Sequence, residues 1–318
     1  MWEETTASQR GSHFLPPGAR LASRPRRSRG FPLSRIAFLG LGTMGEPMAG
    51  NLVQAGFPLH VWNRSPGRGE ALVAVGAKVA ATPRLAAAEA DVIVTMLTGA
   101  DAVDQVLFGA EGAATGDVAG KCFVDCSTSG PRSARSVSER LVAAGARYVD
   151  APVSGTRGPA ERGELVVLAG GDASDVERLL PLFQAIGKRV VQTGPVGSGH
   201  TLKVILNGLG AQHLVAFASL LRLGERAGLS REVVVEAFTE GAFATPAYRG
   251  KRERVLAHQY EGADFVLDLV LRDADLCVEL QDELGMPLPV HRAARSEIER
   301  AVAAGLGALD LFAIERAY

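Results

Sequence analysis

The sequence predicts an α/β fold, with a doubly wound parallel sheet in the first domain and an all-helical second domain. Up to about residue 195, short apolar runs alternate with helical patterns of about 10 to 15 residues. The apolar runs are continuous, as in strands that are covered on both faces of a sheet. After residue 195 the alternation ends, and everything downstream has helix and loop patterns. A length of 318 residues also suits two domains, which we place at 34–195 and 196–318.

The elements of the first domain follow one another in a regular order. We expect strands at residues 36–39, 59–62, 92–96, 122–125, 147–150, 165–168 and 189–192. We expect helices at residues 44–55, 71–75, 131–143 and 172–183. The first three helices end at or next to a glycine, which can adopt the left-handed conformation of a helix C-cap.

The second domain is predicted to be built around one long helix at residues 199–228. Its apolar positions include Leu202, Ile205, Leu206, Leu209, Leu214, Phe217 and Leu221. Further helices are expected at residues 231–238, 267–284 and 293–304. We therefore expect the long helix to begin at the domain boundary and to form the spine of the second domain.

Residues 1–33 differ in composition from the rest of the chain. They are rich in Arg, Ser, Pro and Gly and show no apolar period, so we expect a disordered basic leader. A transit peptide has a similar composition, but Glu3 and Glu4 and the weak amphipathic pattern favour a plain tail or a start codon placed too far upstream.

Composition narrows the possible partners and the compartment. The net charge is −1, which gives no reason to expect a nucleic-acid or membrane partner, and no apolar run approaches the ~20 residues of a membrane helix. Cys122, Cys126 and Cys277 do not form a disulfide framework, which suits a reducing, cytoplasmic location. Neither the cysteines nor the six histidines have ligand spacing, so we expect no metal.

A glycine-rich turn follows the first predicted strand and opens the first helix. Gly40 permits a sharp turn, Gly42 lets the backbone approach a pyrophosphate, and Gly45 lets helix and strand pack closely. The predicted cofactor loop consists of Gly40, Leu41, Gly42, Thr43, Met44 and Gly45. The strand before and the helix after it favour a Rossmann-type dinucleotide site over a turn without a ligand.

The end of the second strand bears on the choice of cofactor. An acidic residue there would bind the ribose hydroxyls of NAD, but the sequence has Asn63, Arg64 and Ser65. A guanidinium can form bidentate hydrogen bonds with a 2′-phosphate. We therefore predict NADP, with NAD possible if Arg64 is only a solvated loop charge.

Four sequence blocks resemble the β-hydroxyacid dehydrogenase family, which includes 3-hydroxyisobutyrate and tartronate semialdehyde dehydrogenases. They lie at residues 38–49, 125–131, 150–155 and 199–207, and the resemblance extends from Arg35 to Tyr318. It implies a 6-phosphogluconate dehydrogenase-like helical domain and a homodimer or higher oligomer. Thr156 stands where the family usually has glycine, and Arg272 precedes Asp273 where the family often has lysine. The resemblance implies that both positions contact the substrate or the nicotinamide.

Lys203 is the predicted general acid and base. An ammonium group can protonate a developing alkoxide and stabilise its charge, and the neutral amine can remove the proton in the reverse direction. Asn207 lies four residues later on the same helix face, where it can orient Lys203 or the substrate. A single helix lysine is normally a solvated surface residue, but Lys203 lies among apolar residues and matches the family's catalytic lysine.

Ser154, Gly155 and Thr156 are the predicted substrate-binding residues. They follow a strand, at the carboxyl edge where ligands bind in such sheets. Backbone N–H groups and two hydroxyls suit a carboxylate, and the resemblance implies that this stretch holds the substrate acid. The alternative is a turn that uses serine and glycine only for conformation.

Four further residues are expected at the nicotinamide end of the cofactor. The resemblance implies that Thr128 contacts this half of the cofactor. Met96 ends the predicted 92–96 strand and Leu97 follows it. Both are expected to line the same cleft, although ordinary packing would explain them as well. Arg272 is assigned to the cofactor or substrate carboxylate, with a solvated helix charge as the alternative.

Together these residues predict an enzyme that transfers a hydride between NADP(H) and a small β-hydroxy acid or its semialdehyde, in a cleft between the domains. Two alternatives remain open. Imine reductases share the fold and NADPH but typically lack a lysine at position 203, and a catalytically idle cofactor-binding module would not need Lys203 and Asn207. We interpret His200 as a satisfied polar residue, because no partner is evident in the sequence.

Overall fold

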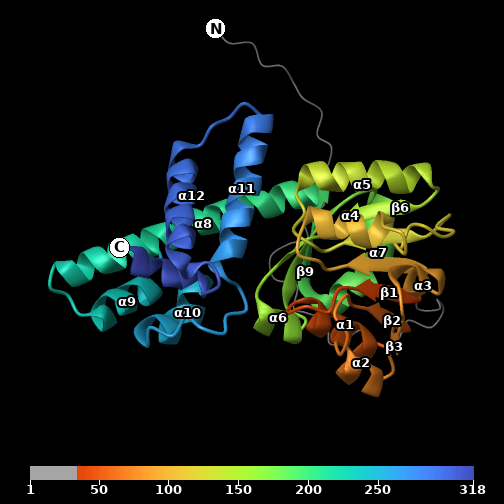
Figure 1. The fold of residues 1–318 in the computed structure, drawn as a ribbon, viewed down its shortest axis with the longest axis horizontal. Coiled ribbons are helices and arrows are strands. Elements are labelled where there is room, and N and C mark those ends of the chain that lie inside the picture. Colours follow the sequence, from red (N-terminus) through yellow and green to blue (C-terminus); the bar gives the residue numbers. More distant parts are fainter. Residues whose placement is uncertain (1–33) are drawn as a thin grey trace, which may run out of the picture. The chain divides into compact units, whose positions relative to one another are not determined.

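A computed structural model describes residues 34–318, and the predicted basic leader at 1–33 lies outside the described residues. The first part of the described chain is built on a sheet with the strand order β3-β2-β1-β4-β5-β6-β8-β7, and β9 pairs with β8 (Figure 1). The strands are β1 Ile36–Leu39, β2 Leu59–Trp62, β3 Lys78–Val79, β4 Val92–Thr95, β5 Cys122–Asp125, β6 Arg147–Asp150, β7 Val153–Ser154, β8 Leu165–Gly170 and β9 Gly187–Gly194.

The prediction of a parallel sheet is confirmed from β3 to β6 and is wrong for β8 and for β9, which runs parallel to β8. All pairs from β3 to β6 are parallel, but β8 runs antiparallel to both β6 and β7. Only 14 residues separate the end of β6 at Asp150 from the start of β8 at Leu165, and they contain β7 and the short helix α6, Arg157–Glu161. A parallel return needs a crossover of a dozen or more residues. This segment instead joins the sheet as β7, and the chain then reverses direction to form β8.

Successive strand residues point to opposite faces of the sheet, and helices cover both of these faces. On one face, Phe38, Val94 and Val124 share a core with α1, Gly45–Gln54, and α7, Ala173–Ile186. On the other face, the strands pack against three helices, which are α3 Pro83–Ala88, α4 Ala100–Phe108 and α5 Pro131–Ala143. The remaining helix of this part, α2 Glu70–Ala74, contributes Leu72 to the first core.

The rest of the described chain is helical, as predicted. Its elements are α8 Ser198–Arg226, α9 Arg231–Glu240, α10 Pro246–Leu256, α11 Leu267–Glu283, α12 Pro289–Ala301, a π-helical turn Val302–Leu306 and a 3-10 turn Leu311–Ala317. Helices α11 and α12 lie side by side and both contact α8 (Figure 1). Helix α10 was not predicted, because Val255 is its one buried residue and an apolar stripe is lacking.

The long helix α8 contacts both parts of the chain. Its amino-terminal end contacts β8, β9 and α5, and its remainder packs against α9, α11 and α12. The predicted core positions in its second half are buried, but Ile205, Leu206 and Leu209 are 52%, 38% and 49% exposed. By length and composition α8 could also cross a membrane, and 39% of its most apolar stretch is buried inside the chain.

Candidate active site

The glycine loop between β1 and α1 has the close approaches that the sequence predicted. Gly40 has φ +105°, and a Cβ there would lie 2.3 Å from the carbonyl oxygen of Met96. A Cβ on Gly45 would lie 1.9 Å from the carbonyl oxygen of Gly40. A Cβ on Gly42 would meet no atom within 4 Å. The loop is therefore closed on the side of β4 and open at Gly42, where a bound group can reach the backbone.

The amino terminus of α1 fits the phosphates of a dinucleotide. Its N-cap residue, Met44, makes no side-chain capping hydrogen bond. The first N–H groups of a helix lack partners within the helix, and its dipole favours an anion at this end. Gly42 and Thr43, just before this helix, are exposed, so a pyrophosphate would have access to these N–H groups.

Asn63 joins the end of β2 to the glycine loop. Its Oδ1 accepts a hydrogen bond from the Leu41 N–H at 2.9 Å, and its Nδ2 donates to the Ser65 carbonyl at 3.0 Å. Both the oxygen and the nitrogen of the Asn63 side-chain amide are therefore hydrogen-bonded, one to the glycine loop and the other to the loop after β2. Arg64 and Ser65 are exposed, and Arg64 has no ion pair among residues 34–318. The guanidinium is therefore available for a ligand.

Asp125, at the carboxyl end of β5, organises the loop that carries Thr128. Its carboxylate accepts hydrogen bonds from Thr95 Oγ1 at 2.8 Å, the Ser127 N–H at 3.0 Å and Ser129 Oγ at 2.9 Å. Ser127 and Ser129 are buried, and Thr128 between them is half-buried. These bonds hold Thr128 at the carboxyl edge of the sheet.

The loop after β4 lies next to this segment. Ser127 Oγ accepts a hydrogen bond from the Leu97 N–H at 2.9 Å, and Leu97 contacts the position that a Gly40 side chain would occupy. Met96 and Leu97 are half-buried. The structure thus brings Met96, Leu97 and Thr128 together beside the glycine loop.

The predicted substrate loop runs from β7 into α6. Gly155 has φ +142°, and a Cβ there would lie 2.6 Å from Leu165 Cδ2, so glycine is required. Thr156 precedes α6 and its hydroxyl makes no capping bond, and both Gly155 and Thr156 are exposed. Ser154 is half-buried at the end of β7. Hydroxyl and backbone groups of this loop are therefore open to a ligand.

Lys203 and Asn207 lie one turn apart on α8, facing an acidic residue from α11. Asn207 Nδ2 donates to Asp273 Oδ2 at 2.6 Å, and Asp273 is buried. Arg272 Nη2 donates to the other oxygen, Asp273 Oδ1, at 2.6 Å. Arg272 Nη1 also donates to the carbonyl of Thr98, in the loop that follows Met96 and Leu97. Arg272 therefore joins the lysine-bearing cluster to the cofactor edge of the sheet.

The surroundings of Lys203 lower the pKa of its ammonium group. Burial is the main cause and the Arg272 charge adds to it, while the Asp273 carboxylate acts in the opposite direction. A lysine with a lowered pKa is a better proton donor and regains its proton less readily in water. The cluster can thus donate a proton to an oxygen atom and stabilise negative charge there.

Several residues of this region had no role in the sequence prediction. Asp273 was noticed only as the neighbour of Arg272, and the roles of Asp125 and Asp150 were not foreseen. His200 was interpreted as a satisfied polar residue, and it has carboxylate partners on two strands. The only available signal was the position of both aspartates at the carboxyl ends of buried strands.

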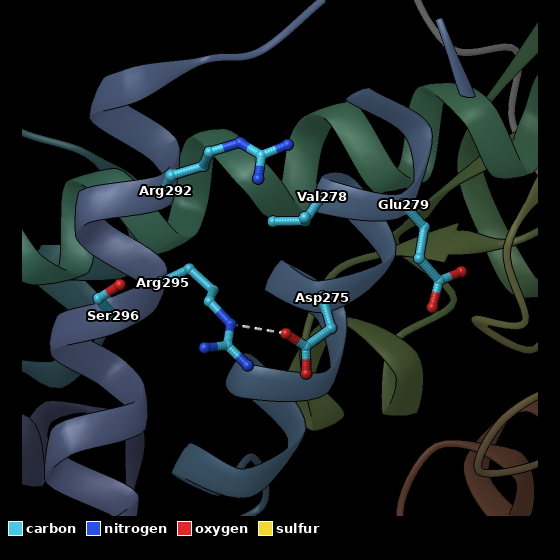
Figure 2. Close-up of a pocket in the computed structure, with 6 residues that line it drawn as sticks. All are labelled: Asp275, Val278, Glu279, Arg292, Arg295 and Ser296. Carbon is cyan, nitrogen blue, oxygen red and sulfur yellow. Dashed lines mark hydrogen bonds and ion pairs between the residues drawn. The ribbon is translucent and has the colours of Figure 1, made fainter. Parts of the chain in front are cut away.

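Two cavities in the described part of the chain lie away from these residues. One, of about 490 Å³, lies between α11 and α12 and is drawn in Figure 2. Its arginines are neutralised, since Arg295 pairs with Asp275 at 2.7 Å and Arg292 pairs with Asp282. A second cavity, of about 350 Å³, opens at the amino edge of the sheet beside Arg35, Lys121 and Arg147. Neither is lined by a predicted site residue, so the cofactor and substrate assignments depend on the loops above.

Both parts of the described chain match models of known protein families. Residues 35–194 match the family model described as the NAD binding domain of 6-phosphogluconate dehydrogenase. Residues 197–318 match the model described as the NAD-binding domain of NADP-dependent 3-hydroxyisobutyrate dehydrogenase. The two models therefore divide the described chain between β9 and α8.

Individual relatives cover nearly the whole described chain. Glyoxylate/succinic semialdehyde reductase 1 from Arabidopsis thaliana is 34% identical over 279 residues, which are 88% of this chain and 96% of the relative. The 3-sulfolactaldehyde reductase of Escherichia coli is 34% identical over 287 residues, with 89% and 95% coverage. The crystal structure of a 3-hydroxyisobutyrate dehydrogenase from Salmonella typhimurium is similar with a TM-score of 0.83 and 29% identity, and the match covers 89% of this chain and 99% of that one.

Proposed function

The chain belongs to the 3-hydroxyisobutyrate dehydrogenase, or β-hydroxyacid dehydrogenase, family of NAD(P)-dependent oxidoreductases, and from this premise we propose its reaction. It transfers a hydride between NADP(H) and a small β-hydroxy acid or its semialdehyde. The observation that carries the proposal is the cluster of Lys203, Asn207 and Asp273, in which burial lowers the pKa of the lysine.

Each part of the site has a role in this reaction. When bound, the nicotinamide supplies or accepts the hydride. The open backbone at Gly42 and the amino terminus of α1 hold the pyrophosphate, and Arg64 holds the 2′-phosphate. Thr128, with Met96 and Leu97, lines the place of the nicotinamide. The residues of this chain thus orient the cofactor and leave proton transfer to α8.

Lys203 moves the proton. In reduction of an aldehyde, its ammonium group donates a proton to the carbonyl oxygen as negative charge develops there. In oxidation of the alcohol, the neutral amine removes the hydroxyl proton. Asn207 donates to Asp273 through Nδ2, so its carbonyl oxygen remains to accept a hydrogen bond from Lys203 or a substrate hydroxyl.

The substrate class follows from the loop at residues 154–156. Its exposed backbone and hydroxyl groups suit an anionic group at one end of a short aldehyde. The names of two relatives point the same way, since glyoxylate, succinic semialdehyde and 3-sulfolactaldehyde each combine an aldehyde with an acid group. We therefore propose a small aldehyde acid as substrate.

A panel of carbonyl compounds tests the proposal. NADPH is incubated with glyoxylate, succinic semialdehyde and a cyclic imine, and its absorbance is followed for the wild type and for Lys203→Ala. We expect Lys203→Ala to keep NADPH binding and to lose at least ~10²-fold in turnover. Lys188→Ala, at an exposed lysine on β9, is the matched control and should keep full activity.

The outcomes distinguish the alternatives. Turnover of the imine without turnover of any aldehyde would make the protein an imine reductase. NADPH binding with turnover of no compound would support a cofactor-binding module. Full activity of Lys203→Ala would contradict the assigned role of the lysine.

We also propose that the chain forms a homodimer or a larger homo-oligomer through α8. Ile205, Leu206 and Leu209 form an apolar row on α8 that is exposed in the single chain. A second copy covering this row would remove it from water, which is favourable in proportion to the apolar area covered. A molar mass of a single chain by light scattering would contradict this arrangement.

A further inference from the structure

His200 lies in the first turn of α8, one turn before Lys203, and the proposed reaction does not use it. Its side chain is fully buried and faces two strands. Its Nδ1 lies 3.3 Å from Asp150 Oδ2 at the end of β6, and its Nε2 lies 3.5 Å from Asp125 Oδ2 at the end of β5. Both aspartates are buried as well, with side chains 0% and 1% exposed. An imidazole thus separates two carboxylates from which water is excluded.

Asp150 also caps the helix that carries Lys203. The N-cap residue of α8 is Gly197, which has no side chain that could cap the helix. The carboxylate of Asp150 accepts hydrogen bonds from the N–H groups of Gly197 at 2.7 Å and His200 at 2.8 Å. A negative charge is favoured at this end of a helix. The first turn of α8 is therefore held by a residue of the sheet.

The first turn has no space in which to shift toward the sheet. A Cβ on Gly199 would lie 2.3 Å from the carbonyl oxygen of Leu168, and a Cβ on Gly170 would lie 2.8 Å from the Gly199 nitrogen. The turn consequently packs directly on β6 and β8. The side-chain contacts of His200 then determine how firmly the first turn of α8 is held against β6 and β8.

The hydrogen-bond partners around the ring fit a proton on each nitrogen. Ser129 Oγ lies 2.9 Å from His200 Nε2 and donates its own hydrogen to Asp125 Oδ2 at 2.9 Å, so it presents a lone pair to the ring. Nε2 must then donate to Ser129. Nδ1 faces the carboxylate of Asp150, which only accepts hydrogen bonds, so Nδ1 donates as well.

The charges in the surroundings agree with a doubly protonated ring. Within the described chain, neither Asp125 nor Asp150 is ion-paired with a lysine or an arginine, and His200 is the partner that both share. The neighbouring phenol of Tyr148 on β6 has its pKa raised by burial and by the charges of Asp125 and Asp150. On α8 itself, the next charged group is Lys203. Two buried carboxylates without a cation between them would lower the stability of the fold, because their charges would be neither hydrated nor compensated.

We propose that His200 is a positioning residue: as an imidazolium between Asp125 and Asp150, it fixes the first turn of α8 and thereby the place of the Lys203 ammonium group. The inference rests on the proposed function for its catalytic consequence. Lys203 is three residues later on the same helix side, so a tilt or loosening of the first turn displaces its nitrogen.

The test compares His200→Gln with His213→Gln, which changes an exposed histidine on the same helix. Glutamine keeps one donor but carries no charge. We expect His200→Gln to lose at least ~10-fold in kcat for aldehyde reduction, with the NADPH Kd within about two-fold of the wild type. Amide hydrogen exchange at residues 198–206 should be at least ~10-fold faster in this variant. His213→Gln should match the wild type in all three.

A further measurement does not depend on turnover. In wild-type protein with ¹⁵N-labelled histidine, both ring nitrogens of His200 should have the shifts of protonated nitrogens at pH 7.5, a signal identified by its loss in His200→Gln. An unprotonated ring nitrogen, or unchanged exchange at residues 198–206 in His200→Gln, overturns the inference. If the wild type reduces no aldehyde, the proposed function fails, and the ring signal and the exchange rates still decide whether the imidazolium holds the helix.

Discussion

Replacing Arg64 by alanine should weaken the binding of NADPH and leave that of NADH unchanged. Arg64 follows β2, is exposed, and has no ion pair among the described residues, so its guanidinium would be free to contact the 2′-phosphate. Hydrogen bonds to charged groups contribute about 1.5–3 kcal/mol each. Exposure to solvent and salt places this contact at the lower end. We expect the NADPH Kd to rise by about ten- to thirtyfold.

Fluorescence titration of both cofactors measures this effect directly. The matched control is Arg68→Ala, because Arg68 is also exposed and lies in the same loop. The difference between the wild type and Arg64→Ala should shrink as salt is raised, because the Debye length falls from about 10 Å at 0.1 M to about 3 Å at 1 M ionic strength and an exposed charge pair is then screened more strongly.

Three results would refute the reasoning. Equal losses for NADPH and NADH would mean that Arg64 supports the loop and not the phosphate. An equal loss in Arg68→Ala would mean that the positive charge of the loop acts as a whole. An unchanged NADPH affinity would remove Arg64 from the site, and the cofactor preference would have to be explained without it.

Two further predictions concern proton transfer and stability. Because burial lowers the pKa of Lys203, kcat for aldehyde reduction, measured from pH 6 to 10, should fall at a pH below the ordinary lysine pKa of about 10.4. Asp273→Asn removes a carboxylate that raises this pKa, so it should move the fall to lower pH, and identical profiles in the wild type and the variant would contradict the role of Asp273. Arg231→Met should lower the free energy of unfolding in urea by about 3–5 kcal/mol, because it leaves Glu315 buried without the arginine that lies 2.7 Å away. Arg84→Met, which removes one member of an exposed ion pair, should lower it by at most ~1 kcal/mol. Burial alone would raise the pKa of Glu315, but Arg231 outweighs burial and the pKa is lowered. The stabilisation by this ion pair is therefore present at neutral pH and is lost as pH falls through the lowered pKa. If Arg231→Met lost the same free energy of unfolding at neutral pH and in acid, this pH dependence would be contradicted.

The central strands could be read from the sequence because each is a run of apolar residues. β1, β2, β5 and β6 have the predicted bounds, and β4 ends one residue earlier than predicted. Burial on both faces makes every position of β1, β4 and β5 apolar or tightly packed. The exposed edge strand β3 has two residues and no such signal.

Some missed helices carried a readable signal and others did not. In α4, Val103, Val106 and Leu107 are the buried residues, and their spacing is that of one helix face. In α3, half of the residues are alanines, which fit equally well in a loop or a helix by pattern alone. The direction of β8 had no local signal, because strand direction depends on how the connecting segment folds and not on the residues of the strand.

The candidate site could be predicted in part. Spacing and motif place the glycine loop, Thr128 and Lys203, since each follows a strand or begins a helix. The partners of these residues could not be predicted in the same way. Asp273 is 66 residues from Asn207, and Asp150 is 50 residues from His200. Such pairs depend on tertiary packing, which one sequence does not reveal.

The two ends of the lysine-bearing segment of α8 are held by different parts of the chain. At its start, Asp150 and Asp125 on the sheet hold His200, and one turn after Lys203, Asp273 on α11 holds Asn207. Lys203 lies between these two attachments, so its position depends on the sheet and on the helical part together. A proton donor must lie within hydrogen-bond reach of the reacting oxygen, and the cofactor is expected at the same edge of the sheet. Anchoring both ends of one helical segment therefore ties the proton donor to the hydride donor, even though they belong to different parts of the fold.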